Sequence, residues 1–171
     1  MLVANQARVA VYHAIAAARR RNRAVVDTAD LLAGVIASHD MVVRMVWQEL
    51  GVDPVALGAV VAMSVRAPIP PRRRVVALRP TAFSADARQV LRHAFMHARE
   101  HHARMLGASH LLLAITAQDA DDGVRGLLSA LDVDGVALAR AVCRCLTGSG
   151  RLSDGHACGA ALCSRGLSGS R

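Results

Sequence analysis

Three histidines in the second half of the chain have a spacing that could hold a metal ion. His93, His97 and His101 recur every four residues, so on a helix their imidazoles lie along one face. Two histidines one turn apart chelate zinc on metalloprotease helices. The Glu that follows the first histidine in that motif is absent, because Ala94 follows His93. We therefore favour a solvated or partly buried polar face over a metal site.

The cysteines form a second pattern of possible metal ligands. Cys143 and Cys145 are followed by His156, Cys158 and Cys163. Zinc-binding pairs are usually spaced C-x-x-C, and these pairs are one residue shorter. We expect free thiols, and we predict neither a metal ion nor another cofactor for this chain.

Nucleophilic side chains show no arrangement that predicts catalysis. Ser84, Ser109 and Ser129 lack the elbow motif of serine hydrolases, and the adjacent Ser109 and His110 cannot face each other on a helix. The chain contains no Lys, which excludes a P-loop and a Schiff-base amine. We expect a protein that is not an enzyme.

Arginine supplies all of the basic charge, and the formal net charge is +8. One cluster comprises Arg19, Arg20, Arg21 and Arg23, and another lies at 72–74. Both could contact phosphates or an acidic partner. Arginines near a helix C-terminus also interact favourably with its dipole, and no aromatic residue interleaves with either cluster. A small basic regulator that binds nucleic acid is therefore the alternative function rather than the favoured one.

An internal repeat organises the elements that carry these residues. Shifted by 80 residues, the chain aligns with itself, and after one inserted residue it aligns at a shift of 81. The matches include Ala7 with Ala87, Arg8 with Arg88, His13 with His93, Leu31 with Leu111, and Leu50 with Leu131. This register over two whole units predicts a duplicated fold.

Helical periodicity predicts four helices in each unit. Hydrophobic residues make up 53% of the chain and aromatic residues 2%, a composition that suits close-packed helices rich in Ala and Leu. In the first unit we expect helices over 3–21, 28–36 and 41–50, and one that begins after Asp53. In the second unit we expect helices over 84–102 and 134–146, and one that is capped by Ser109. The predicted class is all-α, with eight helices.

The order of motifs in the two units resembles the amino-terminal domain of the Clp ATPases. The residues of the resemblance are Phe83 to Arg88, Ser109 to Ile115 and Leu131 to Asp134 in the second unit, with Ala7-Arg8, Thr28 to Val35 and Leu50 to Asp53 in the first. It covers about residues 3–146. The resemblance implies a tandem, pseudo-twofold pair of four-helix repeats that docks substrates and adaptors.

By this resemblance we expect a stand-alone Clp N domain that binds a protein or peptide. It would serve as an accessory factor or as a decoy that sequesters peptide ligands, and its partner would be a Clp ATPase, an adaptor or a client. The implied ligand contacts are Phe83, with Arg88 and Arg92 from the same helix, and Val3 as the equivalent of Phe83 in the first repeat.

One departure from the family affects the expected ligand. Relatives that recognise phosphoarginine have Glu at two positions that hold Ala29 and Ser109 in this chain. A guanidinium group pairs strongly with a carboxylate. We therefore do not expect this protein to recognise phosphoarginine.

Composition divides the chain into four parts. We expect one Clp repeat at 1–64, a linker rich in Pro and Arg at 65–82, a second repeat at 83–146 that forms one compact domain with the first, and a disordered tail at 147–171. No signal peptide is evident, and the apolar run 55–63 is about half as long as a membrane span requires. We expect a cytoplasmic protein with no membrane partner.

Overall fold

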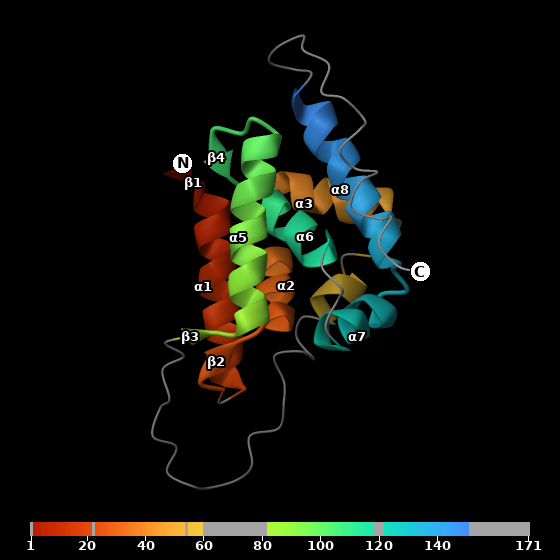
Figure 1. Cartoon of the computed structure of the whole chain (residues 1–171). Coiled ribbons are helices and arrows are strands. Elements are labelled where there is room, and N and C mark those ends of the chain that lie inside the picture. The colour runs from red at the N-terminus through yellow and green to blue at the C-terminus, as the bar shows by residue number, and fades with distance from the viewer. Residues whose placement is uncertain (1, 22, 54, 60–81, 118–121, 151–171) are drawn as a thin grey trace, which may run out of the picture.

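The computed structural model describes residues 2–21, 23–53, 55–59, 82–117 and 122–150 (Figure 1). The helices are α1 (Asn5–Arg20), α2 (Thr28–Ala37) and α3 (Met41–Glu49) in the first repeat, and α5 (Ala85–Glu100), α6 (Ala108–Ala117), α7 (Asp122–Ala130) and α8 (Gly135–Gly150) in the second. Residues 55–59 are also helical and occupy the place of a fourth helix in the first repeat. The predicted all-α class with eight helices is confirmed. Residues 147–150, expected to belong to a disordered tail, are helical, and the rest of that tail and most of the expected linker lie outside the described residues.

Within the described residues, four strands of two residues each join the repeats, and the sequence did not predict them. They are β1 (Leu2–Val3), β2 (Val25–Val26), β3 (Ala82–Phe83) and β4 (Met105–Leu106). β1 pairs in parallel with β4, and β2 pairs in parallel with β3. The shift of 80 residues maps β1 onto β3 and β2 onto β4. Each pair therefore joins one strand of the first repeat to one strand of the second, as a pseudo-twofold axis requires.

Backbone hydrogen bonds next to the strands repeat this symmetry. The N–H of Ala4 donates to the carbonyl of Leu106, and the N–H of Ser84 donates to the carbonyl of Val26, both at 2.9 Å. β1 and β4 lie at one end of the α1 and α5 pair, and β2 and β3 lie at the other end (Figure 1). The two helices therefore run in opposite directions.

Small residues bring the helices of each repeat close together. α1 packs along α2 and α5 packs along α6. Buried alanines line both contacts: Ala7, Ala10, Ala14 and Ala18 in α1, and Ala87, Ala94 and Ala98 in α5. In α2, Gly34 has no room for a Cβ, which would lie 2.8 Å from the backbone nitrogen of Ala14.

One hydrophobic core contains residues of both repeats. α2 and α6 are buried over most of their length and contact each other, so they form its centre (Figure 1). Trp47 of α3 is 3% exposed and belongs to this core. Apolar burial across the junction, together with the exchanged strands, holds the repeats in one arrangement.

Several predicted helix ends are confirmed. Asp27 caps α2 by accepting the N–H of Asp30 at 2.7 Å, and the Asp30 carboxylate accepts the N–H of Asp27 in return, at 3.2 Å. Asp40 caps α3, and Ser84 caps α5 by accepting the N–H of Ala87. α3 ends before Gly51, whose φ of 69° lies in the left-handed region that glycine adopts readily.

Two predicted helix ends are wrong. Ser109 does not cap α6, because the helix begins at Ala108 and Ser109 lies buried in its first turn. His110 satisfies the backbone there instead, since its Nδ1 accepts the N–H of Gly107 at 3.1 Å. α8 runs to Gly150 rather than ending near Leu146. Thr147 lies within this helix, and its hydroxyl donates to the carbonyl of Cys143, one turn back.

Candidate functional site

The four predicted ligand contacts lie on two strands and on one helix. Val3 in β1 is 39% exposed, whereas Phe83 in β3 is half-buried against the core. Arg88 and Arg92 are exposed on α5, one turn apart. Arg88 also donates from Nε to the carbonyl of Ser84 at 3.4 Å, which draws its side chain toward the start of the helix.

Not all of the four residues come together in space. β3 leads directly into α5, so Phe83, Arg88 and Arg92 share the first half of that helix. Val3 pairs with β4, which follows the other end of α5. A helix of 16 residues is about 24 Å long. Val3 is therefore separated from Phe83 by roughly the length of α5.

The exposed face of α5 contains apolar residues that the sequence analysis missed. Phe95 is 38% exposed and Met96 is 54% exposed. With Arg88, Arg92 and Arg99 they follow a helical spacing that places them opposite the buried alanines of the same helix. This set of five residues is called the α5 face below. Their offset from the buried stripe was the signal that could have revealed them.

α1 presents an equivalent but different surface. A shift of 80 residues maps Arg88 onto Arg8, Arg92 onto Tyr12 and Arg99 onto Arg19, and all three α1 residues are exposed. Tyr12 is 69% exposed. The same shift maps Phe95 onto Ile15 and Met96 onto Ala16, which are only partly exposed. The two helices therefore share a pattern, but the exposed large apolar side chains lie at different positions, Tyr12 in α1 against Phe95 and Met96 in α5.

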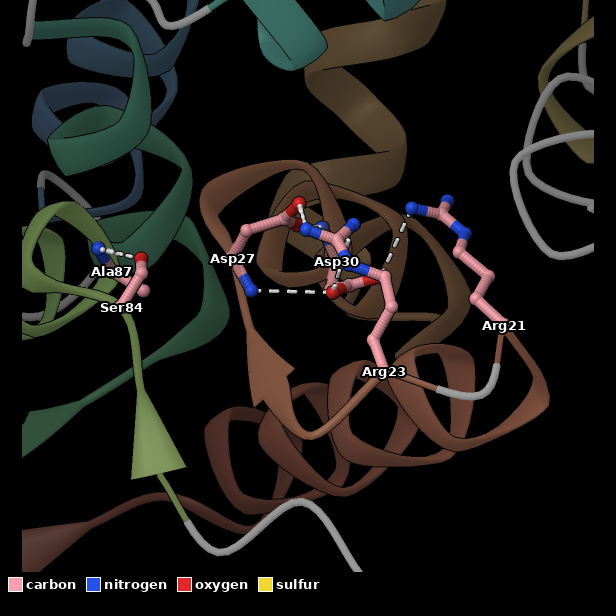
Figure 2. Close-up of polar contacts among 6 residues, drawn as sticks. All are labelled: Arg21, Arg23, Asp27, Asp30, Ser84 and Ala87. Carbon is pink, nitrogen blue, oxygen red and sulfur yellow. Dashed lines mark hydrogen bonds and ion pairs between the residues drawn. The ribbon is translucent and has the colours of Figure 1, made fainter. Parts of the chain in front are cut away.

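An ion-pair cluster lies at the start of α2, beside the strands β2 and β3 (Figure 2). Arg21 Nη1 lies 3.2 Å from Asp30 Oδ1, and Arg23 pairs with Asp27 and lies 3.9 Å from Asp30. The Asp30 side chain is fully buried. Burial raises the pKa of Asp30 to about 6, with a further contribution from Asp27. Burial would raise the pKa of Asp27, but its pKa is lowered. The backbone N–H of Asp30 and the guanidinium group of Arg23 both stabilise the charged carboxylate.

The second repeat has a histidine pair at the equivalent place. A shift of 80 residues maps Arg21 onto His101 and Asp30 onto His110, whose ring centroids lie 6.3 Å apart. Burial lowers the pKa of His110 to about 4, and the neighbouring imidazoles of His101 and His97 lower it further. Burial also lowers the pKa of His101. The two arginines that lie beside Asp30 in the first repeat, Arg21 and Arg23, thus correspond to His101 and Ala103 in the second.

The possible metal ligands do not converge. His97 Nδ1 lies 3.0 Å from Glu100 Oε2, whereas His101 turns toward His110. Among the described residues, no group of three or more His, Cys, Asp or Glu side chains could hold a metal ion. His156, Cys158 and Cys163 lie outside those residues.

The two described cysteines, Cys143 and Cys145, form no disulfide with each other. Cys145 Sγ lies 3.5 Å from Glu49 Oε2. The other carboxylate oxygen of Glu49 accepts a hydrogen bond from Arg144 Nε at 2.6 Å. Burial and the neighbouring Glu49 carboxylate raise the pKa of the Cys145 thiol. The protonated thiol is therefore favoured over the thiolate that would bind a metal.

Two of the four arginines in the cluster at the end of α1 are engaged within the protein. Arg21 and Arg23 pair with the aspartates of α2, and only Arg19 and Arg20 are exposed there without such partners. The cluster at 72–74 lies outside the described residues. Ala29 and Ser109, the positions that carry Glu in phosphoarginine-binding relatives, are 6% and 5% exposed. Neither offers an exposed acceptor for a guanidinium group.

Comparison with known proteins identifies the class of this fold. The family described as Clp repeat (R) N-terminal domain matches residues 82–161. Among solved structures, a protein from a malarial protein secretion system has a TM-score of 0.65 at 14% identity, and it covers 87% of this chain and 97% of that one. None of the curated proteins matches.

Two further structures are N-terminal domains of Clp-type chaperones. The Hsp104 N-terminal domain from Candida albicans has a TM-score of 0.63 at 14% identity. The matched region covers 83% of this chain and 89% of the Hsp104 chain. The N-terminal domain of ClpD from Arabidopsis thaliana has a TM-score of 0.58 at 20% identity. The matched region covers 82% of this chain and 92% of the ClpD chain. Residues 82–161 match the Clp N-terminal-domain family, and the described chain as a whole has the fold of these domains, which confirms the resemblance. None of the described helices has the length and apolar character needed to cross a bilayer.

Proposed function

We propose that this chain is a non-enzymatic module that binds polypeptides through the α5 face and Phe83. In proteins of this class the same fold mediates the docking of substrates and adaptors. The observation that carries the proposal is the α5 face itself, where Arg88 and Arg92 stand one turn apart and precede the exposed Phe95 and Met96. The partner would be a Clp ATPase, an adaptor or a client in the cytoplasm. The chain would act on it as an accessory factor or decoy.

The chemistry of the α5 face defines the segment that it would bind. Arginine pairs with carboxylates, and exposed aromatic and methionine side chains gain free energy when a partner covers them. Arg, Met and aromatic residues are enriched in protein interfaces, whereas Lys and Glu are depleted. A segment with acidic and apolar residues in alternation fits this surface better than an RNA or DNA backbone does.

A charge reversal on α5 tests the proposal. We expect Arg92→Glu to reduce recovery of the bound polypeptide at least about fivefold in a quantitative pull-down, since losing one buried ion pair and adding repulsion costs 1 kcal/mol or more. Arg140→Glu is the matched control, because Arg140 is also exposed but lies on α8. Equal recovery with both variants would contradict the assignment of the α5 face.

Salt dependence separates this function from nucleic-acid binding. Phosphate contacts release counterions, so binding would fall linearly in a plot of log affinity against log salt, with a steep slope. We expect only a mild dependence of binding on salt, because three of the six proposed contact residues, Phe83, Phe95 and Met96, are apolar. The arginine cluster of α1 also argues against nucleic-acid binding. Two of its members are already paired with aspartates and are less available to phosphates.

A further inference from the structure

A pocket opens in the first repeat, at the end of α2, along α3 and beside the helical residues 55–59. Its volume is about 340 Å³, which lies within the range of small-ligand sites. Most of its wall is apolar, and includes Ile36, Val43, Trp47, Val52 and Leu57. None of the residues of the α5 face lines it. The indole Nε1 of Trp47 is buried and has no hydrogen-bond acceptor in the described structure.

Polar groups of α3 stand at this pocket. Arg44 and Gln48 line it one turn apart and are exposed, and within the described part of the chain neither side chain has a hydrogen bond or an ion pair. His39 and Asp40 also line the pocket, but the Asp40 carboxylate accepts the N–H groups of Val42 and Val43. An uncommitted guanidinium group and an uncommitted amide therefore face a ligand that enters here.

The corresponding positions of the second repeat differ in both respects. The shift of 81 residues maps Arg44 onto Arg125, which pairs with Asp122 at 3.0 Å. It maps Leu57 onto Leu138, which is fully buried, whereas Leu57 is only partly buried. The first repeat thus has a more exposed leucine and an arginine that forms no ion pair with a described residue, at positions where the second repeat has a buried leucine and an arginine paired with Asp122.

We propose that this pocket binds the C-terminal residue of a partner polypeptide, with its apolar side chain against Val43 and Trp47 and its carboxylate on Arg44. Arginine matches a carboxylate in charge and in bidentate geometry. The Gln48 amide supplies both a donor and an acceptor for the last peptide group. An aliphatic acid without a peptide group would leave Gln48 unmatched. That the partner is a polypeptide rests on the proposed function.

Trp47 is the only tryptophan of the chain, so its fluorescence reports on this pocket directly. The full chain would be titrated with an acetylated tripeptide that ends in Leu with a free carboxylate, with the same tripeptide as its C-terminal amide, and with octanoate. We expect a saturable change of tryptophan emission with the free acid. Binding of the amide and of octanoate should be at least about tenfold weaker, because each lacks one of the two polar matches.

Variants of equivalent arginines give the control. Arg44→Gln should lower the affinity for the free acid to that for the amide, whereas Arg125→Gln should leave it unchanged; circular dichroism would verify the helical content of both. Equal affinity for acid and amide, an unchanged Arg44→Gln, or octanoate binding as tightly as the tripeptide would overturn the proposal. Arg92→Glu should bind the tripeptide like the wild type. Loss of pull-down by that variant without any tripeptide binding would leave the α5 proposal standing and remove this one.

Discussion

Asp30 and His110 occupy equivalent positions in the two repeats and are both buried at a helix start. Burial favours the neutral form of each, so it raises the pKa of Asp30 to about 6 and lowers the pKa of His110 to about 4. An acid with a raised pKa and a base with a lowered pKa respond to acidification in opposite directions. Single substitutions should separate these two contributions to stability.

Replacing His110 should make the protein less sensitive to acid. The unfolded state has the higher pKa, 6.5 against about 4, so it binds the proton more readily and stability is lost as the pH falls through this window. Between pH 7 and pH 5 this loss amounts to about 2 kcal/mol, since one pKa unit corresponds to 1.36 kcal/mol. His110→Asn removes it, as urea unfolding at the two pH values would measure. An unchanged pH dependence would refute the burial of a neutral imidazole.

Replacing Asp30 should have the opposite effect on the pH dependence. Its folded-state pKa of about 6 exceeds the unfolded value of 3.8, so the folded state takes up the proton and gains stability as the pH falls from 6 toward 3.8. Asp30→Asn removes this gain, by about 1 kcal/mol between pH 7 and pH 5. The same urea series should show a steeper loss on acidification than in the wild type. A shallower loss would contradict the assignment.

Close packing between elements makes Gly34 the position least tolerant of a methyl group. A Cβ there would collide with the backbone of Ala10 and Ala14 in α1, and backbone cannot move aside as a side chain can. We expect Gly34→Ala to lower the free energy of unfolding by about 3 kcal/mol. Gly126 of α7 is the matched control, because open space surrounds it. There the change to Ala should raise stability by about 0.5–1 kcal/mol; equal effects of both changes in thermal unfolding would argue against this packing.

Helices were predictable from the sequence because their signals are local. Capping residues such as Asp27, Asp40 and Ser84, and the left-handed Gly51, fix the ends of helices within one turn. The strands were not predictable, since two residues such as Leu2–Val3 show no alternation and their partners lie about 100 residues away. Ser109 was assigned to the wrong role because His110, not a hydroxyl, satisfies the N-terminus of α6.

The arrangement of the whole molecule decides which predicted site residues share a surface. The repeat showed that Val3 and Phe83 are equivalent, but equivalence under a twofold axis does not mean proximity. The exchanged strands place them at opposite ends of the antiparallel α1 and α5. Phe95 and Met96 were missed because apolar residues within a helix were read as core, although their offset from the buried alanines places them on the exposed face. The Arg144–Glu49 pair, which joins α8 to α3, likewise depends on the tertiary fold.

Binding of a polypeptide on the α5 face is the central claim, and site-specific photocrosslinking tests it most directly. A photoreactive amino acid would replace Arg92 in one variant and Arg140 in another, both at exposed positions. After irradiation in cells, we expect protein adducts from position 92 at several times the yield from position 140. Equal yields at the two positions, or adducts with nucleic acid in place of protein at position 92, would contradict the account.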